Sequence, residues 1–311
     1  MYDVIALGEL LVDLAERTKD ENGYPTLAAN PGGAPGNFLA ALSAYGKKTA
    51  FLAKVGDDTF GHLLTGTMRR AGIDTRGILI SPDTFTTLAF VTFDAHGDRS
   101  FAFARKPGAD TQLRWEEIDP AMLEQARVFH FGSLSCTDEP ARTATQKAAA
   151  YARAHGKLVT YDPNYRANLW KNKEDAIAQM KAPLPLVDIL KVSDEELPLL
   201  TGTTDCESGT AQLAQNGIRL IFVTLGANGV FYRFGEKTGH VAGVPCKVGD
   251  TNGAGDTFFG AALSKLCKEE LDTLTVDKLE SVLAFANKAA SITTSRHGAI
   301  PAMPTLAEVE G

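Results

Sequence analysis

A glycine-rich loop leads directly into a helix in the C-terminal part of the chain. Residues 248–258 read Val-Gly-Asp-Thr-Asn-Gly-Ala-Gly-Asp-Thr-Phe, and Phe258, Ala262 and Leu266 then recur at every fourth position, which is helical spacing. The first turn of a helix has backbone N–H groups without helical partners, and its dipole favours negative charge. Glycines let an anion approach those groups closely. This stretch therefore predicts a phosphate-binding loop.

An acidic residue, Asp256, lies inside this predicted loop. Its simplest interpretation is the ordinary preference of Asp for the first turn of a helix. The alternative is phosphoryl transfer, in which backbone N–H groups stabilise charge on phosphate while a carboxylate accepts the proton of an attacking hydroxyl. The choice between the two interpretations depends on the rest of the chain.

Charge and cysteine content limit the classes of partner. The chain has 311 residues and a formal net charge of −7, which argues against nucleic acid or an anionic membrane as its main partner. Its four cysteines form no C-x-x-C pair, so we expect free thiols and a cytoplasmic protein. No apolar run approaches the ~18 residues of a membrane-spanning helix.

Strands and helices alternate through most of the sequence, which predicts an α/β fold with a mostly parallel sheet, helices on both faces and ligands at the carboxyl ends of the strands. The section from Thr86 to Ala104 departs from this alternation, because it reads as a β-hairpin turning at Asp94–Asp98. We expect residues of about 11–29 and 86–106 to form a small sheet that covers the main sheet, within a single domain of residues 1–311. The expected strands are 3–8, 49–55, 128–131, 158–161, 189–192 and 220–224, and the expected helices are 58–71, 139–155, 173–181, 208–216 and 276–294.

A second glycine-rich loop precedes a helix near the N-terminus. It reads Asn-Pro-Gly-Gly-Ala-Pro-Gly-Asn over residues 30–37, and Pro35 suits a first helical turn because proline has no N–H to leave unpaired. Neither loop fits G-x-G-x-x-G, and G-x-x-x-x-G-K-[ST] does not occur. A nicotinamide oxidoreductase or a P-loop nucleotidase is therefore disfavoured.

Together, the two loops resemble the signatures of a known family. Gly32–Asn37, followed by Val-Gly-Asp-Asp-Thr-Phe-Gly at 55–61, is similar to the N-terminal signature of ribokinase-like (PfkB-family) sugar kinases, and 250–258 is similar to the C-terminal one. The order and spacing most resemble those of the fructokinases. The resemblance implies a three-layer αβα fold with a β-sheet lid, ATP as donor, Mg²⁺ bound to the phosphates, and a small neutral sugar as acceptor.

The resemblance also assigns roles to residues around the phosphate. It makes Asp256 the catalytic base and the backbone of Gly253, Ala254 and Gly255 the anion hole. The family's N-x-x-E motif appears here with serine in place of asparagine, as Ser193 to Glu196, and Glu196 would order water bound to Mg²⁺.

For the sugar, the resemblance implies contacts from both ends of the chain. Asp13 would accept hydrogen bonds from sugar hydroxyls, and Gly33 would let the sugar approach the backbone. Asn37 would contact the sugar through its amide, although helix capping is an alternative role. Arg105 and Arg166 would lie on the substrate side; for Arg105 a solvated charge on the hairpin is the alternative.

For the nucleotide, the resemblance places Thr224, Gly226 and Gly229 beneath the adenosine and phosphates. Asn287 would line the adenine pocket from the last long helix, or be a plain surface amide. Many relatives bind K⁺ through an acidic residue at the position of Asp250 and through carbonyl groups near it and at 295–298. The resemblance therefore implies a K⁺ site at Asp250 here.

Several alternatives remain open on the sequence alone. A 2-keto-3-deoxygluconate kinase shares the arginine-containing loop before Leu169 and Trp170, whereas Arg105 favours a neutral sugar. Ribokinase and nucleoside kinase are less favoured because such relatives usually carry Asn where this chain has Glu9. A catalytically silent sugar-binding regulator of the same fold is a further possibility. The lid strands have open edges, so a homodimer through the lid is also expected.

Overall fold

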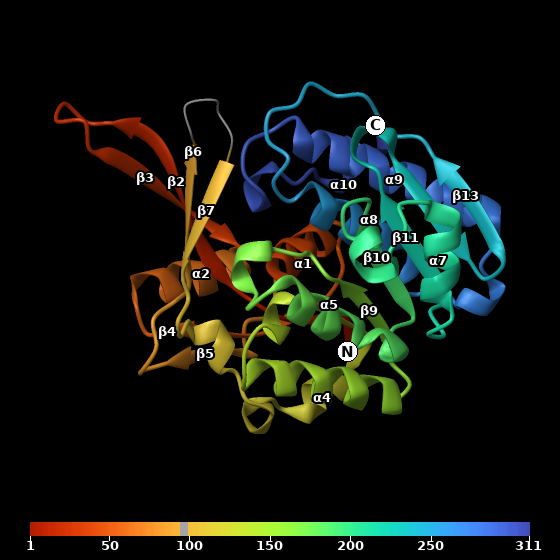
Figure 1. Ribbon diagram of the computed structural model, residues 1–311, viewed down its shortest axis with the longest axis horizontal. Helices are drawn as coiled ribbons and strands as arrows, with labels where there is room; N and C mark the ends of the chain where they lie inside the picture. The colour runs from red at the N-terminus through yellow and green to blue at the C-terminus, as the bar shows by residue number, and fades with distance from the viewer. Residues whose placement is uncertain (94–98) are drawn as a thin grey trace.

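The computed structural model describes residues 1–93 and 99–311, and its main feature is a nine-stranded sheet (Figure 1). The sheet order is β13-β12-β11-β10-β9-β8-β1-β4-β5, in which only β12 and β13 run antiparallel to their neighbours. The predicted mostly parallel sheet is confirmed. Its strands are β1 (Tyr2–Leu7), β4 (Thr49–Gly56), β5 (Ile78–Ser81), β8 (Ala126–Gly132), β9 (Leu158–Asp162), β10 (Ile189–Ser193), β11 (Leu220–Thr224), β12 (Val230–Phe234) and β13 (Lys237–Val241).

Helices cover both faces of this sheet because successive strand residues point to opposite sides. In β1, Val4 and Ala6 join one hydrophobic core while Ile5 and Leu7 join the other. The first core is covered by α1 (Ala34–Ala44), α2 (Thr59–Arg70), α8 (Ala254–Leu266), α9 (Val276–Thr294) and α10 (Leu306–Glu310). The second is covered by α3 (Pro120–Glu124), α4 (Ala141–Ala154), α5 (Lys173–Lys181), α6 (Leu197–Thr201) and α7 (Cys206–Ala214).

A second, four-stranded sheet, which we call the lid, extends from the carboxyl end of β1. Its order is β3-β2-β6-β7, and its longest hairpin projects from the body at the left of Figure 1. The predicted hairpin of 86–104 is present as β6 and β7, and its expected turn at Asp94–Asp98 lies outside the described residues. The lid strands are β2 (Leu11–Lys19), β3 (Pro25–Gly32), β6 (Leu88–Phe93) and β7 (Arg99–Ala104).

Two short elements position the lid against the main sheet. Only Gly8 to Leu10 separate β1 from β2, so the lid is anchored to β1, which is an inner strand of the main sheet. The following hairpin returns through β3 into Gly33, which is the N-cap of α1. No helix in the described residues is long and apolar enough to cross a membrane.

Candidate active site

A large cavity lies between the lid and the carboxyl ends of the parallel strands. Its volume is about 1110 Å³, and it is lined by Asp13 and Asn30 from the lid and by Ser193 and Thr224 from the ends of β10 and β11. Ligand pockets commonly measure ~300–1,000 Å³, so this cavity has room for more than one small molecule. It is at the position where open α/β sheets bind ligands.

The helix α8 begins at the wall of this cavity. Gly253 is its N-cap in the left-handed region, at φ +75°, and no side chain among the described residues caps the helix. Gly253, Gly255 and Asp256 line the cavity, and Ala254 is the first residue of the helix between them. A free helix N-terminus with glycines attracts anions. The arrangement can therefore hold phosphate oxygens against backbone N–H groups.

Asp256 is buried beside this helix terminus. Its Oδ2 accepts a hydrogen bond from Asn37 Nδ2 at 2.9 Å, and its Oδ1 accepts one from Asn164 Nδ2 at 3.3 Å. Burial raises the pKa of Asp256, while the Asn37 bond and the charges of Lys191 and Arg166 oppose that rise. Two amides thus fix the orientation of a carboxylate that faces the cavity.

Asn37 belongs to the first half of α1 but does not cap it, because the N-cap is Gly33 and no side chain caps the helix among the described residues. Gly33 has φ +112°, and a Cβ there would lie 2.4 Å from the backbone oxygen of Glu9. Only glycine fits this position without strain. The start of α1 is therefore held very close to the base of the lid, about one helical turn before Asn37.

Asp13 and Arg166 line the same cavity from different elements, Asp13 from the lid strand β2 and Arg166 from the loop after β9. Burial raises the pKa of Asp13 to about 6, and the Arg166 charge and a hydrogen bond with Asn252 oppose the rise. Arg166 is exposed, and its Nη1 donates to the backbone oxygen of Tyr165. Both side chains can reach a ligand in the cavity.

Arg105 is buried rather than a solvated charge on the hairpin. Its guanidinium donates to Asp110 Oδ2 from Nε at 2.9 Å and from Nη2 at 2.7 Å, and it also donates to Thr137 Oγ1 and the Leu134 oxygen, each at 2.8 Å. Leu134 lines the cavity, and Arg105 lies behind it. Its direct contact with substrate therefore stays a prediction.

Glu196 is buried and joins two loops at the floor of the cavity. Its Oε1 accepts from the backbone N–H of Tyr165 at 2.7 Å, and its Oε2 accepts from that of Ser193 at 2.8 Å. Ser193 Oγ in turn accepts from the N–H of Glu196 at 3.1 Å. Ser193, the serine that departs from the family motif, thus forms a reciprocal pair of hydrogen bonds with Glu196. Carboxylate oxygens lining a cavity suit water-mediated binding of Mg²⁺.

Of the predicted nucleotide-side residues, Thr224 lines the cavity. Gly226 and Gly229 have positive φ, and a Cβ on Gly229 would lie 2.2 Å from the oxygen of Val241. Asn287 is buried, and its Nδ2 donates to the oxygens of Val241 and Ala242 at 3.1 and 2.9 Å. Asn287 is thus not a surface amide. Within the described residues, these three positions shape the strand end behind Thr224 rather than the cavity wall itself.

Asp250 lies where the loop before α8 meets the end of α9. Its Oδ1 accepts from the N–H of Asn252 at 2.9 Å, and its Oδ2 accepts from the N–H of Gly298 at 3.2 Å. A Cβ on the neighbouring Gly249 would lie 2.9 Å from the backbone oxygen of Ser295. The structure thus brings together the acidic group and the carbonyl-bearing loop that the K⁺ prediction requires.

A buried ion pair at this sheet edge was not predicted. Lys191 Nζ lies 2.9 and 3.1 Å from the two carboxylate oxygens of Asp162, and both side chains are less than a tenth exposed. A Cβ on Gly255 would lie 3.1 Å from Lys191 Nζ, so the ammonium group lies next to the start of α8. A lysine within the apolar strand Ile189–Ser193 is a sequence signal for such a pair, since lysine is rarely buried alone.

Comparison with known proteins gives one consistent family. A model of the pfkB family of carbohydrate kinases matches residues 1–306. Over 308 residues the chain is 40% identical to "Probable fructokinase-2" of Arabidopsis thaliana, covering 97% of this chain and 93% of that protein.

Solved structures of fructokinases also resemble this chain over nearly its whole length. A fructokinase with bound ATP from Xylella fastidiosa superposes with a TM-score of 0.93 at 32% identity, covering 100% and 98% of the two chains. A Vibrio cholerae fructokinase with bound fructose, ADP and calcium superposes with a TM-score of 0.88 at 31% identity, covering 99% of this chain and 97% of that chain. With the family model spanning nearly the whole chain and Asp256 at the start of α8, this protein belongs to the pfkB family of carbohydrate kinases.

Proposed function

We propose that this kinase transfers the γ-phosphoryl group of ATP to fructose, giving fructose 6-phosphate and ADP. The observation that carries the proposal is the carboxylate of Asp256, buried against an uncapped helix N-terminus and facing a cavity large enough for nucleotide and sugar. The relatives described above support fructose as the acceptor, since one of them is named as a fructose complex.

The proposed reaction is an in-line displacement at the γ-phosphorus. The sugar hydroxyl oxygen forms the new P–O bond, the bond to the β-γ bridging oxygen breaks, and ADP leaves. Asp256 accepts the hydroxyl proton, with Asn37 and Asn164 holding its two oxygens in place. The N–H groups at the start of α8 stabilise negative charge that develops on the phosphoryl oxygens.

Cations complete the proposed site. Mg²⁺ bound with ATP would neutralise charge on the phosphates, and Glu196 would hold it through water while keeping its own backbone hydrogen bonds. Asp250 and the carbonyl of Ser295 would hold K⁺ beside the start of α8. The groups named at both places offer oxygen ligands, as these hard cations require.

The sugar contacts favour a neutral substrate over 2-keto-3-deoxygluconate. Arg105 is held by Asp110 through two hydrogen bonds and so offers no free charge to an acid substrate, whose carboxylate would have to rely on Arg166. Arg166 remains at the cavity surface, and we assign it to sugar or phosphate oxygens. Asp13, Gly33 and Asn37 form the proposed sugar side of the cavity.

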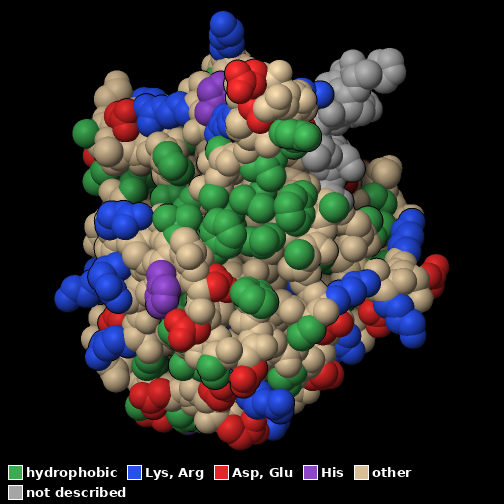
Figure 2. Space-filling model, turned by 90° about the vertical axis from the view of Figure 1, so that its left-hand side faces the viewer, with side chains coloured by type: hydrophobic (Ala, Val, Ile, Leu, Met, Phe, Trp, Pro, Cys, Tyr) green, Lys and Arg blue, Asp and Glu red, His purple; other side chains and the backbone are tan. Residues whose placement is uncertain are grey.

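The lid supports two further parts of the proposal. It would close over bound sugar and exclude water, which limits hydrolysis of ATP. Its strand β3 is an open edge, and Figure 2 shows hydrophobic side chains gathered on the side of the molecule that carries the lid. An open strand edge and an apolar surface on the same side of the molecule suit a homodimer through the lid. The free cysteines among the described residues fit a cytoplasmic location.

An ADP-release assay coupled to NADH oxidation tests the proposal. Fructose, other hexoses, ribose, 2-keto-3-deoxygluconate and a nucleoside are compared at equal concentration, with Asp256→Asn as the inactive control. We expect the highest kcat/KM for fructose. A higher value for another acceptor would overturn the choice of sugar, and fructose binding without any turnover would indicate a sugar-binding regulator.

A further inference from the structure

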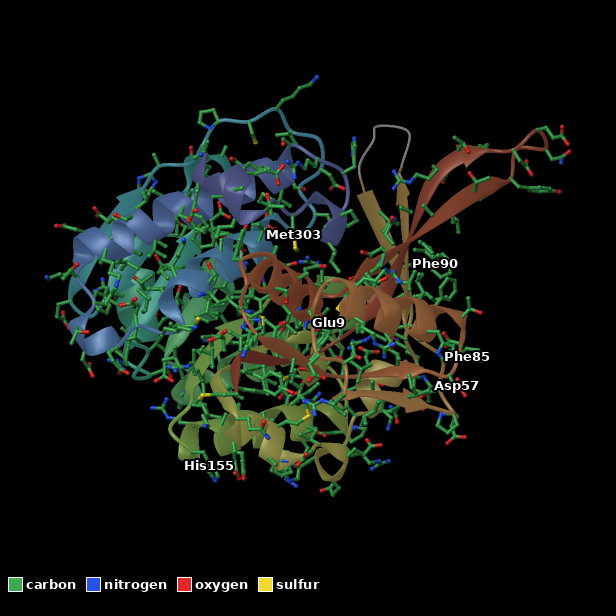
Figure 3. All side chains as sticks on the ribbon, turned by 180° about the vertical axis from the view of Figure 1, so that it is seen from behind. Glu9, Asp57, Phe85, Phe90, His155 and Met303 are labelled. Carbon is green, nitrogen blue, oxygen red and sulfur yellow. The ribbon has the colours of Figure 1, made fainter. Side chains whose placement is uncertain are left out.

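Glu9 is a buried acidic residue that none of the predicted roles includes. It lies in the short connection between β1 and β2, is 2% exposed, and lines the cavity together with Leu11 and Gly33. Figure 3 shows it in the interior of the molecule, far from the exposed Asp57 and Phe85. A carboxylate at this depth is costly unless its oxygens have partners.

Only one of the two carboxylate oxygens of Glu9 has a partner in the described part of the chain. Oε1 accepts a hydrogen bond from the backbone N–H of Ala34 at 3.0 Å, at the first residue of α1. Oε2 is buried and has no hydrogen-bond partner there. Burial raises the pKa of Glu9 to about 7, against the opposing charge of Arg105. An unsatisfied buried polar atom requires an explanation in a folded protein.

A second unsatisfied acceptor lies on the same wall. Asn37, one turn along α1 from Ala34, donates its Nδ2 to Asp256, while its Oδ1 is buried and unpartnered among the described residues. Both Glu9 and Asn37 line the cavity. Phosphate groups carry acceptors at neutral pH and cannot satisfy either oxygen, whereas neighbouring sugar hydroxyls can donate to both.

We propose that Oε2 of Glu9 accepts a hydrogen bond from a sugar hydroxyl other than the one that is phosphorylated. Glu9 is then a specificity-determining residue, because a substrate lacking that hydroxyl leaves the buried oxygen unpaired. The inference rests on the proposed sugar kinase activity and adds Glu9 to the residues that contact the sugar. The competing explanation is purely structural, with Glu9 fixing the start of α1 and balancing Arg105.

A cycle of enzyme and substrate variants separates the two explanations. Glu9→Gln keeps an oxygen for the Ala34 N–H and removes the acceptor at Oε2. Wild type and variant are assayed with fructose and with a series of deoxyfructoses, each lacking one hydroxyl. For wild type we expect one deoxyfructose to lose about 10- to 100-fold in kcat/KM, the usual worth of a hydrogen bond to a charged group. In the variant that loss should fall below about 3-fold, with an unchanged KM for ATP.

The matched control is Asp110→Asn, which removes another buried charge beside Arg105 without touching the cavity lining. It should keep the wild-type discrimination among deoxyfructoses. Glu9→Asp, which withdraws the carboxylate by one methylene, replaces Glu9→Gln if the latter does not fold. If the Glu9 variant discriminates among all analogues as wild type does, Glu9 does not contact the sugar. If wild type prefers another sugar, the proposed substrate fails separately, and the same cycle with deoxy forms of that sugar still tests Glu9.

Discussion

Replacing Lys191 with methionine removes the buried ammonium group from a cluster of carboxylates. Lys191 pairs with Asp162 at 2.9 and 3.1 Å, with the two side chains 7% and 4% exposed. Removing one partner of such a buried pair costs about 3–5 kcal/mol, because the other charge stays buried without compensation. A domain is stable by only about 5–15 kcal/mol, so we expect Lys191→Met to lose a large part of its free energy of unfolding.

The loss should depend on pH in a definite direction. Burial raises the pKa of Asp162 while Lys191 opposes that rise, so removing Lys191 raises the pKa further. A carboxyl group whose pKa is higher in the folded than in the unfolded state stabilises the fold at low pH, and this stabilisation is lost as the pH rises through its folded pKa. Relative to wild type, the variant should therefore be less destabilised at pH 5 than at pH 8.

Urea denaturation of wild type and variants at the two pH values measures this effect. The double variant Lys191→Met with Asp162→Leu should recover most of the loss, since an apolar pair replaces the ion pair. Lys278→Met breaks the exposed pair with Glu269 and should cost only about 0–1 kcal/mol. A loss below about 1 kcal/mol for Lys191→Met, or no recovery in the double variant, would refute the reasoning.

Four further results are expected. Asp256→Asn should lower kcat by about 10²–10⁴-fold, the usual worth of a general base, with nucleotide binding kept; near-normal turnover in single-turnover assays would remove Asp256 from the role. Gly33→Ala should cost about 1–3 kcal/mol from backbone strain at φ +112° and weaken fructose binding, and an unchanged melting temperature and KM would contradict this. Because burial raises the pKa of Asp13 to about 6, the carboxylate that we propose as the acceptor for sugar hydroxyls is lost below that pH. Calorimetry should then show the fructose Kd rising by about fivefold from pH 6 to pH 5, and an Asp13→Asn variant with the same pH dependence would argue against this. Exchanging K⁺ for Na⁺ should reduce kcat of the wild type and leave Asp250→Asn unaffected, whereas equal responses would place the ion elsewhere.

The glycine loop and the helix that follows it could be predicted from the sequence because their parts are adjacent in the chain. Gly253, Gly255 and Asp256 lie at one helix start, and the geometry of a helix start is local. The alternation of strands and helices also predicted the parallel sheet and the carboxyl edge where ligands bind. The hairpin of the lid followed from the interruption of that alternation.

Contacts between distant segments could not be predicted in the same way. The bond from Asn37 to Asp256 joins residues 219 apart, and only the packing of α1 against α8 decides it. The sequence shows that Arg105 is a cation, but it does not show that Asp110 forms a buried ion pair with it. The unpaired oxygen of Glu9 likewise depends on how the lid is connected to β1.

The sequence by itself determined local geometry and the order of secondary-structure elements. These are a glycine loop that opens a helix, a carboxylate in the first turn of that helix, and strands that alternate with helices. Only the tertiary structure decided which polar groups are buried, which of them pair, and which keep a free oxygen facing the cavity. The physical reason is that the energy of a buried charge or hydrogen bond depends on distances of a few ångströms and on exclusion of water. Both are set by the three-dimensional packing of segments far apart in the chain.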